Sequence, residues 1–173
     1  SLAGKELLGM PVAKRTEQGI GRAFQLTNLF PNLSVFENVR LVVQAKQKQG
    51  FDLFSMASSH AEIFDAADLV LEKVNLLDQR DTTVSALPHG DQRKLEVAML
   101  IALDPLVYMF DEPTAGMSAD EAPVVLELIR TLKEDKSKCI LLVEHKMDVI
   151  RTLADRIIVL HNGALVADGA PTE

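Results

Sequence analysis

Hydrophobic positions along the chain fall into two patterns, helical spacing and short unbroken runs. Helical spacing predicts helices over residues 35–47, 61–77, 91–103, 118–132 and 147–153. Short apolar runs flanked by breakers predict strands over residues 20–24, 106–110, 139–143, 156–160 and 164–167. Asn162-Gly163 predicts a hairpin turn between the last two strands. This alternation predicts an α/β fold with a mostly parallel sheet, whose ligand site lies at the carboxyl ends of the strands.

Composition limits the classes of protein to which the chain belongs. Its 173 residues suit one domain, or one domain with an inserted lobe, and 47% hydrophobic with 25% charged residues excludes a disordered chain or a rod. The net charge of −7 argues against a general affinity for nucleic acid or anionic lipid. The single cysteine, Cys139, lies in an apolar run and is expected to be a small buried hydrophobe in a reducing compartment.

Two adjacent titratable side chains follow each of two predicted strands. The run 106–110 leads into Asp111 and Glu112, a pattern that phosphoryl chemistry uses, with one acid for Mg²⁺ and one to polarise water. The run 139–143 leads into Glu144 and His145 at the same sheet edge, where His145 can reach a γ-phosphate and Glu112. The alternative interpretation is a solvated loop carrying ordinary surface acids and a surface histidine.

Two further segments offer weaker signals. Gln25 ends the strand 20–24, and its amide can contact Mg²⁺ or the water. The loop 87–92 comes just before a helix, so Gly90 and the first free N–H groups make a possible anion site. Many helices begin after Pro and Gly, which makes this second pattern weak by itself.

Taken in order, these segments resemble the nucleotide-binding subunits of ABC transporters. Gln25 resembles the Q-loop of that family, and His145 resembles its switch histidine. Residues 87–92 resemble the signature loop, residues 106–112 the Walker B strand, and residues 115–118 the D-loop. The resemblance is greatest to importers of branched-chain amino acids, related hydrophobic amino acids, amides and urea. The segments that carry this closer resemblance are residues 19–25, 29–30, 34–38 and 111–117.

The resemblance implies a P-loop NTPase-like sheet core with a helical subdomain, lacking its N-terminal part. The expected domains are 1–26, a remnant of the N-terminal core with the Q-loop strand; 27–98, the helical subdomain with the signature loop; and 99–173, the core with Walker B, D-loop and switch histidine. The implied cofactors are ATP and Mg²⁺. Their expected residues are Glu112 and His145 for catalysis, Gln25, Pro88, His89, Gly90 and Asp91 for ATP, and Asp111 and Gln25 for the metal.

The same resemblance implies partners and a location. ABC transporter membrane subunits are expected to dock in a groove of the helical lobe, with Leu29, Phe30 and Phe36 as groove candidates, although core packing is favoured for Phe36. A second nucleotide-binding subunit, identical or different, would complete the ATP sites, and a periplasmic solute-binding protein would act indirectly; nucleic acid is not an expected partner. The expected location is the cytoplasmic face of the inner membrane, as a peripheral subunit.

The chain departs from the family pattern at three places. No G-x-x-x-x-G-K-[ST] loop is present, so the chain is expected to be a fragment that begins after the Walker A region and is inactive alone. Pro88 and His89 replace the usual serine and first glycine of the signature, and Ser118 stands where the D-loop often has Asp or Asn. An ABC-type ATPase outside transport, acting on ribosomes or DNA, is the alternative function.

Overall fold

The structure is a computed structural model that describes residues 1–2, 4–23, 29–46 and 58–171. Its helices are α1 (Val12–Glu17), α2 (Val35–Lys46), α3 (Ser58–Lys73), α4 (His89–Leu103), α5 (Ala122–Glu134) and α6 (Met147–Leu153), with 3₁₀ turns η1 (Leu77–Gln79) and η2 (Val84–Ala86). Its strands are β1 (Ile20–Ala23), β2 (Val107–Asp111), β3 (Cys139–Val143), β4 (Ile157–His161) and β5 (Ala164–Gly169). The predicted α/β fold is confirmed.

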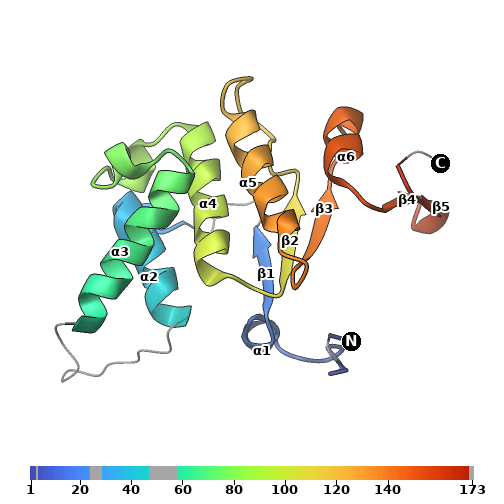
Figure 1. The fold of residues 1–173 in the computed structure, drawn as a ribbon, viewed down its shortest axis with the longest axis horizontal. Coiled ribbons are helices and arrows are strands. Elements are labelled where there is room, and N and C mark those ends of the chain that lie inside the picture. Colours follow the sequence, from blue (N-terminus) through green and yellow to red (C-terminus); the bar gives the residue numbers. More distant parts are fainter. Residues whose placement is uncertain (3, 24–28, 47–57, 172–173) are drawn as a thin grey trace.

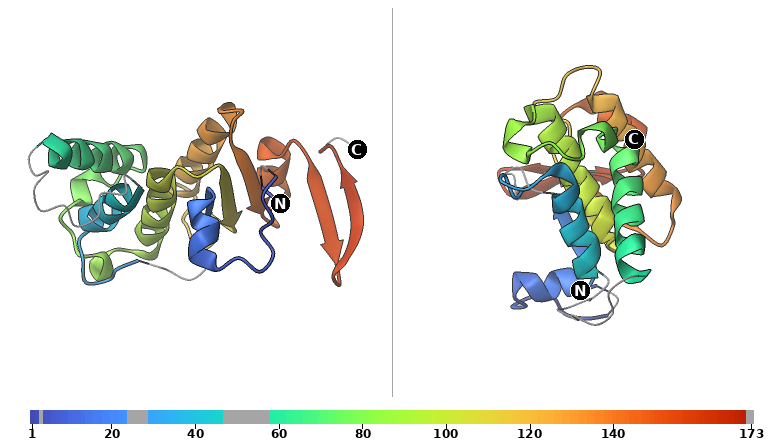
Figure 2. Two further views of the ribbon diagram at one scale, coloured as in Figure 1. Left: turned by 90° about the horizontal axis from the view of Figure 1, so that it is seen from below. Right: turned by 90° about the vertical axis from the view of Figure 1, so that its left-hand side faces the viewer.

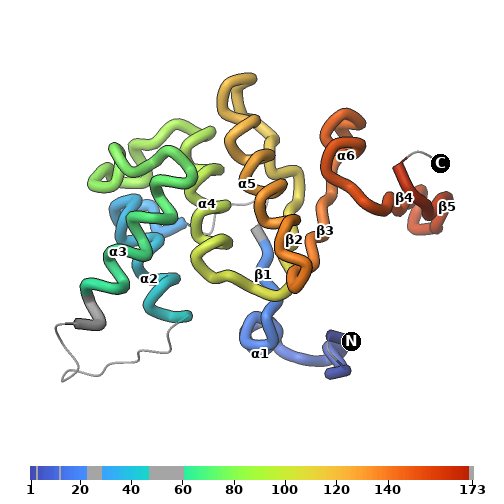
Figure 3. The backbone as a smooth tube through the Cα atoms, in the orientation of Figure 1, coloured from blue at the N-terminus to red at the C-terminus, as the bar shows by residue number. Residues whose placement is uncertain are grey.

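Within the described residues, β1, β2 and β3 form a parallel sheet in that order. Ala23 lies opposite Phe110, and Asp111 lies opposite Val143, so the carboxyl ends of the three strands meet at one edge. The chain leaves the sheet after β1, builds the helices α2 to α4, and returns at β2 (Figure 3). The chain therefore leaves the sheet at the carboxyl end of β1 and re-enters at the opposite edge, where Val107 of β2 lies opposite Ile20 of β1.

The last two strands form a separate antiparallel hairpin. In Figure 1, β4 and β5 lie at one end of the molecule, beyond α6 and apart from the sheet of β1 to β3. Asn162 and Gly163 take φ values of 49° and 76°, the left-handed conformation that a two-residue hairpin turn requires. The predicted turn is confirmed, and β4 pairs with β5 instead of extending the parallel sheet.

Two hydrophobic clusters meet at α4. The first lies among α2, α3 and α4 and includes Leu95 and Ala98; the second joins α4 to β2, α5 and α6 and includes Val97 and Leu100. Figure 2 shows α2, α3 and α4 gathered at one end of the molecule, with α5 and the strands beyond them. Phe36 is buried in the first cluster, as its expected core packing requires. The boundaries 1–26, 27–98 and 99–173 stay predictions.

The start of α2 is held by two polar side chains. Ser34 Oγ accepts the N–H of Glu37 at 3.2 Å, a side-chain cap of the first free N–H groups of the helix. Asn38 is fully buried, and its amide exchanges hydrogen bonds with the backbone N–H (2.8 Å) and C=O (3.2 Å) of Phe30. The described residues just before α2, 29–34, are therefore held against the helix, with Phe30 half-exposed on the surface.

The expected burial of Cys139 is wrong. Cys139, Leu141 and Val143 alternate along β3 on a face that is exposed among the described residues. An apolar run predicts a strand but does not say which of its faces is covered, and here only Ile140 and Leu142 pack against the second cluster. No described helix is both long and apolar enough to cross a membrane.

Candidate functional site

The strand β2 ends in two adjacent carboxylates. Tyr108 and Phe110, both almost fully buried, anchor the strand in the second cluster, and the chain then presents Asp111 and Glu112 at the sheet edge. The side chains of both acids are about one-third exposed or less, at 27% and 32%. Arg22 Nη2 from β1 lies 3.2 Å from Asp111 Oδ2, so the residue predicted to hold a metal is paired with a cation.

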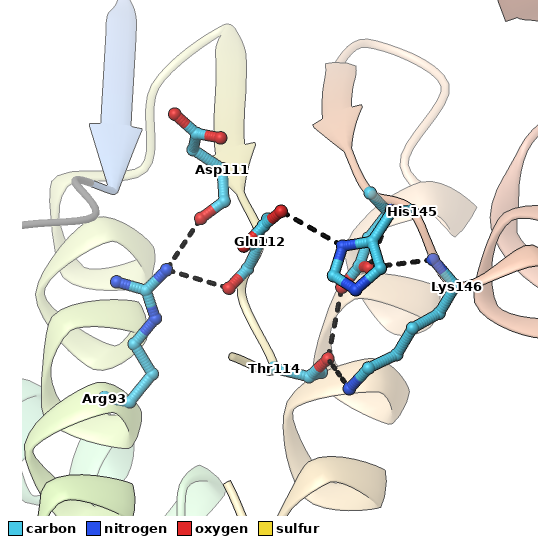
Figure 4. Close-up of polar contacts among 7 residues, drawn as sticks. Arg93, Asp111, Glu112, Thr114, His145 and Lys146 are labelled. Carbon is cyan, nitrogen blue, oxygen red and sulfur yellow. Dashed lines mark hydrogen bonds and ion pairs between the residues drawn. The ribbon is translucent and has the colours of Figure 1, made fainter. Parts of the chain in front are cut away.

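Glu112 and His145 lie together, although 33 positions separate them in the chain. Glu112 Oε1 lies 3.0 Å from His145 Nδ1, and the imidazole is otherwise well exposed. Figure 4 shows the two side chains meeting from the loops that follow β2 and β3. The structure thus joins the pair that the sequence placed at one edge, while their chemical roles stay predictions. A neutral histidine that donates from Nδ1 can only accept at Nε2, whereas an imidazolium donates from both nitrogens.

The backbone at Glu112 adopts a conformation that is uncommon for a residue with a side chain. Its φ is +46°, in the left-handed region. The N–H of Glu112 donates to the carbonyl of Val143 at 2.9 Å, and its own carbonyl accepts the N–H of Ala115 at 3.0 Å. These bonds turn the chain sharply after β2 and direct the Glu112 carboxylate toward the loop of His145.

A second polar contact joins the two loops, and the sequence did not point to it. Thr114, 1% exposed, donates from Oγ1 to Glu144 Oε1 at 3.1 Å, and Lys146 Nζ donates to the same hydroxyl at 3.2 Å. Glu144 Oε2 in turn accepts the backbone N–H groups of His145 (3.2 Å) and Lys146 (3.4 Å). The loops that carry Glu112 and His145 are therefore fixed to each other by these polar contacts.

Arg93 of α4 is another residue of the site that the sequence did not identify. Its Nη2 donates to the carbonyl oxygens of Asp111 at 2.7 Å and Glu112 at 3.0 Å, and its Nη1 donates to Glu96 Oε2 at 2.6 Å. Burial raises the pKa of Glu96, although the bond from Arg93 opposes this. Because the contact joins a side chain to backbone carbonyls far along the chain, no local spacing could have revealed it.

The expected signature residues begin α4. Pro88 occupies the N-cap position, His89 is exposed and Gly90 is buried. A Cβ added at Gly90 would fall on the carboxylate of Glu121, the flexible end of a side chain that would have to move aside. Close packing at Gly90 therefore brings the start of α4 against the start of α5.

Asp91 makes internal contacts. Its carboxylate accepts hydrogen bonds from Lys94 Nζ at 2.8 Å and Gln79 Nε2 at 3.0 Å. Burial alone would raise the pKa of Asp91, but the bonds from Lys94 and Gln79 outweigh it and lower the pKa. Its predicted contact with ATP, like those of Pro88, His89 and Gly90, stays a prediction.

The donors available for a metal are few. Gln25, predicted for both ATP and metal, lies outside the described residues. Among the described residues no group of three or more His, Cys, Asp and Glu side chains gathers as a metal site. Mg²⁺ commonly binds proteins through one or two carboxylates, with waters and substrate phosphates completing its shell. The partly exposed carboxylate of Asp111 fits an ion held in that way.

An apolar pocket of about 450 Å³ lies between α2 and α4. Its wall is mostly aliphatic and aromatic, with the charged residues Arg22 and Glu96 also lining it. The apolar part is formed chiefly by Leu29, Phe30, Leu41, Val42, Ala45 and Met99. Leu29 and Phe30, two of the three groove candidates, therefore share one pocket, whereas Phe36 belongs to the core.

Known proteins share the sequence and the fold of this chain. The high-affinity branched-chain amino acid transport ATP-binding protein LivG of Salmonella typhimurium is 34% identical over 180 residues, covering 100% of this chain and 70% of LivG. The corresponding protein BraF of Pseudomonas aeruginosa is 32% identical and is covered to 69%. The structure of the ATP-binding cassette MJ0796 bound to ADP and Pi superposes with a TM-score of 0.77 at 26% identity.

The lengths of these proteins differ from that of this chain. The superposition covers 92% of the chain but 66% of MJ0796, slightly under two thirds of its length. The family model described as ABC transporter matches residues 2–115, which include β1, the helices α2 to α4 and the turn after β2. This match, together with the 34% identity to LivG over the full length of this chain, shows that the chain belongs to the ABC transporter family.

Proposed function

We propose that the chain is the catalytic part of an ATP-hydrolysing subunit of an ABC importer, in which Glu112 activates the attacking water. The observation that carries the proposal is the contact between Glu112 Oε1 and His145 Nδ1, next to Asp111 at the end of a buried strand. A carboxylate placed beside a histidine at a sheet edge is suited to orienting water and contacting the transferred phosphoryl group. The names of LivG and BraF support ATP as the nucleotide.

The residues divide the work between them. Glu112 accepts a proton from water at its carboxylate, and His145 orients that carboxylate through Nδ1. Asp111 would hold Mg²⁺ after the Arg22 side chain moves away from its carboxylate, and Gln25 is the predicted second ligand of the ion. Bound Mg-ATP would supply the electrophilic phosphorus and neutralise charge as the leaving group departs. Gly90 and the first N–H groups of α4 would contact a nucleotide held by a second subunit, without help from Pro88, which has no N–H.

The relatives and the pocket support a proposal for the transported solute and the partners. LivG and BraF are named for branched-chain amino acid transport, so we propose branched-chain or other hydrophobic amino acids as the solute. The apolar pocket between α2 and α4 would receive a segment of the membrane subunits. The assembly would include a second nucleotide-binding subunit and, indirectly, a periplasmic solute-binding protein, with this subunit peripheral to the cytoplasmic face of the inner membrane.

Calorimetric titration with Mg-ATP tests the proposal. The 173-residue chain and a chain extended by the sequence encoded upstream are titrated side by side, and hydrolysis is measured for the extended chain. We expect binding and hydrolysis only by the extended chain, because the phosphate loop is expected to precede these residues. Tight binding by the 173-residue chain would require a phosphate site built from other residues, and an extended chain without hydrolysis would contradict the proposed activity.

Co-purification distinguishes transport from other work of an ABC-type ATPase. The tagged extended chain is isolated from membranes of the source cells, and its partners are identified. Recovery of hydrophobic membrane subunits supports the importer. Retained ribosomes or DNA without membrane subunits would favour the non-transport alternative, which the net charge of −7 disfavours.

A further inference from the structure

The turn that presents Glu112 needs support from outside itself. The left-handed conformation is strained for a residue with a side chain, and such residues persist where the surroundings hold them. At φ +46°, Glu112 is held on its amide side by the carbonyl of Val143. On its carbonyl side, Glu112 accepts the N–H of Ala115, and a side chain of α4 donates to the same oxygen.

That side chain is Arg93. Besides the two short bonds from Nη2 to the carbonyls of Asp111 and Glu112, its Nε points to the carbonyl of Pro113 at 3.4 Å. A planar guanidinium can address several carbonyl oxygens at fixed angles, which an ammonium group cannot do. Figure 4 shows Arg93 reaching the turn from the side opposite His145.

Glu96 holds Arg93 in this orientation. The two residues lie one helical turn apart on α4, with the ion pair at 2.6 Å and side-chain exposures of only 11% and 6%. An ion pair so well shielded is stronger than one on the surface, and its loss leaves an uncompensated charge. Arg93 therefore has a fixed base on α4 from which it contacts the turn.

We propose that Arg93, oriented by Glu96, is a positioning residue that holds the Glu112 turn in its left-handed conformation and so aims the Glu112 carboxylate at the reacting water. The inference rests on the proposed function of Glu112. It also gives α4 a direct connection to the catalytic carboxylate, because the helix that begins at the expected signature residues holds the turn through one side chain. A displacement of α4 along its axis is thereby transmitted to Glu112.

Kinetics of the extended chain test the catalytic consequence. Arg93→Ala should lower kcat for ATP hydrolysis about 10- to 100-fold while KM changes less than about twofold, since a misplacement of about 1 Å costs that much without altering nucleotide binding. Arg93→Lys should recover part of the loss, and millimolar guanidinium ion should restore activity to Arg93→Ala. Glu96→Gln, which keeps an acceptor for Arg93, should lower kcat less than Arg93→Ala.

Arg130→Ala is the matched control. Arg130 pairs with Glu127 at the same i, i+3 spacing on α5, but both side chains are about two-thirds exposed. Its replacement should leave kcat and KM within about twofold. Equal losses in Arg93→Ala and Arg130→Ala, or a wild-type kcat in Arg93→Ala, would overturn the inference while leaving the proposed function intact.

Amide hydrogen exchange tests the positioning role without ATP. The variant is Arg93→Lys, which keeps the charge and so guards against an alanine variant that fails to fold. It should speed exchange of the Glu112 and Ala115 amides about tenfold or more, since the hydrogen bonds of these two amides flank the turn. The Ile150 amide, bonded to Lys146 in α6, should be unchanged. Unaltered exchange at Glu112 and Ala115 would overturn the inference, even if the wild-type extended chain fails to hydrolyse ATP and the proposed function is wrong.

Discussion

Thr114, which is buried, and Glu144 are joined by a partly buried hydrogen bond of 3.1 Å that fixes the loop after β2 to the loop after β3. We expect Thr114→Val, which keeps the side-chain volume, to lower the free energy of unfolding by about 2 kcal/mol, because it leaves a carboxylate oxygen without its donor. Urea denaturation measures the loss. Thr131→Val, the same change at an exposed helix position, should alter stability by less than about 0.5 kcal/mol.

Replacing the proposed general base separates chemistry from binding. In the extended chain, Glu112→Gln should lower kcat by about 100-fold or more, because the amide cannot accept the proton from water. Calorimetric affinity for Mg-ATP should stay near the wild-type value, and size-exclusion chromatography in ATP should show a trapped closed dimer. Glu127→Gln, on the exposed face of α5, serves as the control. Unchanged turnover in Glu112→Gln would remove Glu112 from its proposed role.

The buried pair between Asp91 and Lys94 should make stability depend on pH in a defined direction. Asp91→Asn removes the carboxylate at 2.8 Å from Lys94 and leaves it only the more distant Glu121 at 3.9 Å among the described acids, so it should cost about 2 kcal/mol at neutral pH. Because the pKa of Asp91 is lowered in the fold, its contribution is complete above the unfolded pKa of about 3.9 and is lost as pH falls through the lower folded pKa.

Urea midpoints of wild type and Asp91→Asn, measured from neutral to acid pH, check this dependence. The difference between the two proteins should be constant near neutrality and shrink below about pH 4. Glu127→Gln removes an exposed pair of the same spacing and should show almost no difference at any pH. A difference for Asp91→Asn that grows on acidification would contradict the assigned sign.

Blocking the apolar pocket should separate partner binding from catalysis. Ala45 is an exposed residue of the pocket wall, so Ala45→Arg places a charged chain where we propose a membrane-subunit segment docks. We expect co-purification of membrane subunits to fall about tenfold or more, while ATP hydrolysis by the isolated extended chain is retained. Leu69→Arg, at an exposed position of α3 outside the pocket, is the control. Equal recovery of membrane subunits with both variants would argue against docking in this pocket.

The order of elements could be predicted from hydrophobic spacing, because a buried parallel strand leaves an unbroken apolar run and an amphipathic helix leaves a stripe. The meeting of Glu112 and His145 was expected since parallel strands end at one edge. Arg93 and Thr114 could not be found in this way, because bonds between distant segments leave no periodic signal. Cys139 was misjudged because an apolar run does not reveal which face of its strand is covered.

The position of α4 in both hydrophobic clusters has a consequence for folding. Leu95 and Ala98 pack on the helical side, whereas Val97 and Leu100 pack on the side of the sheet. Neither cluster can lose its contacts without exposing one side of the same helix, so the two should melt together in a single cooperative transition. For the same reason, rotation of the helical region against the sheet must proceed by small shifts of packed side chains along α4, not by separation of two independently folded bodies.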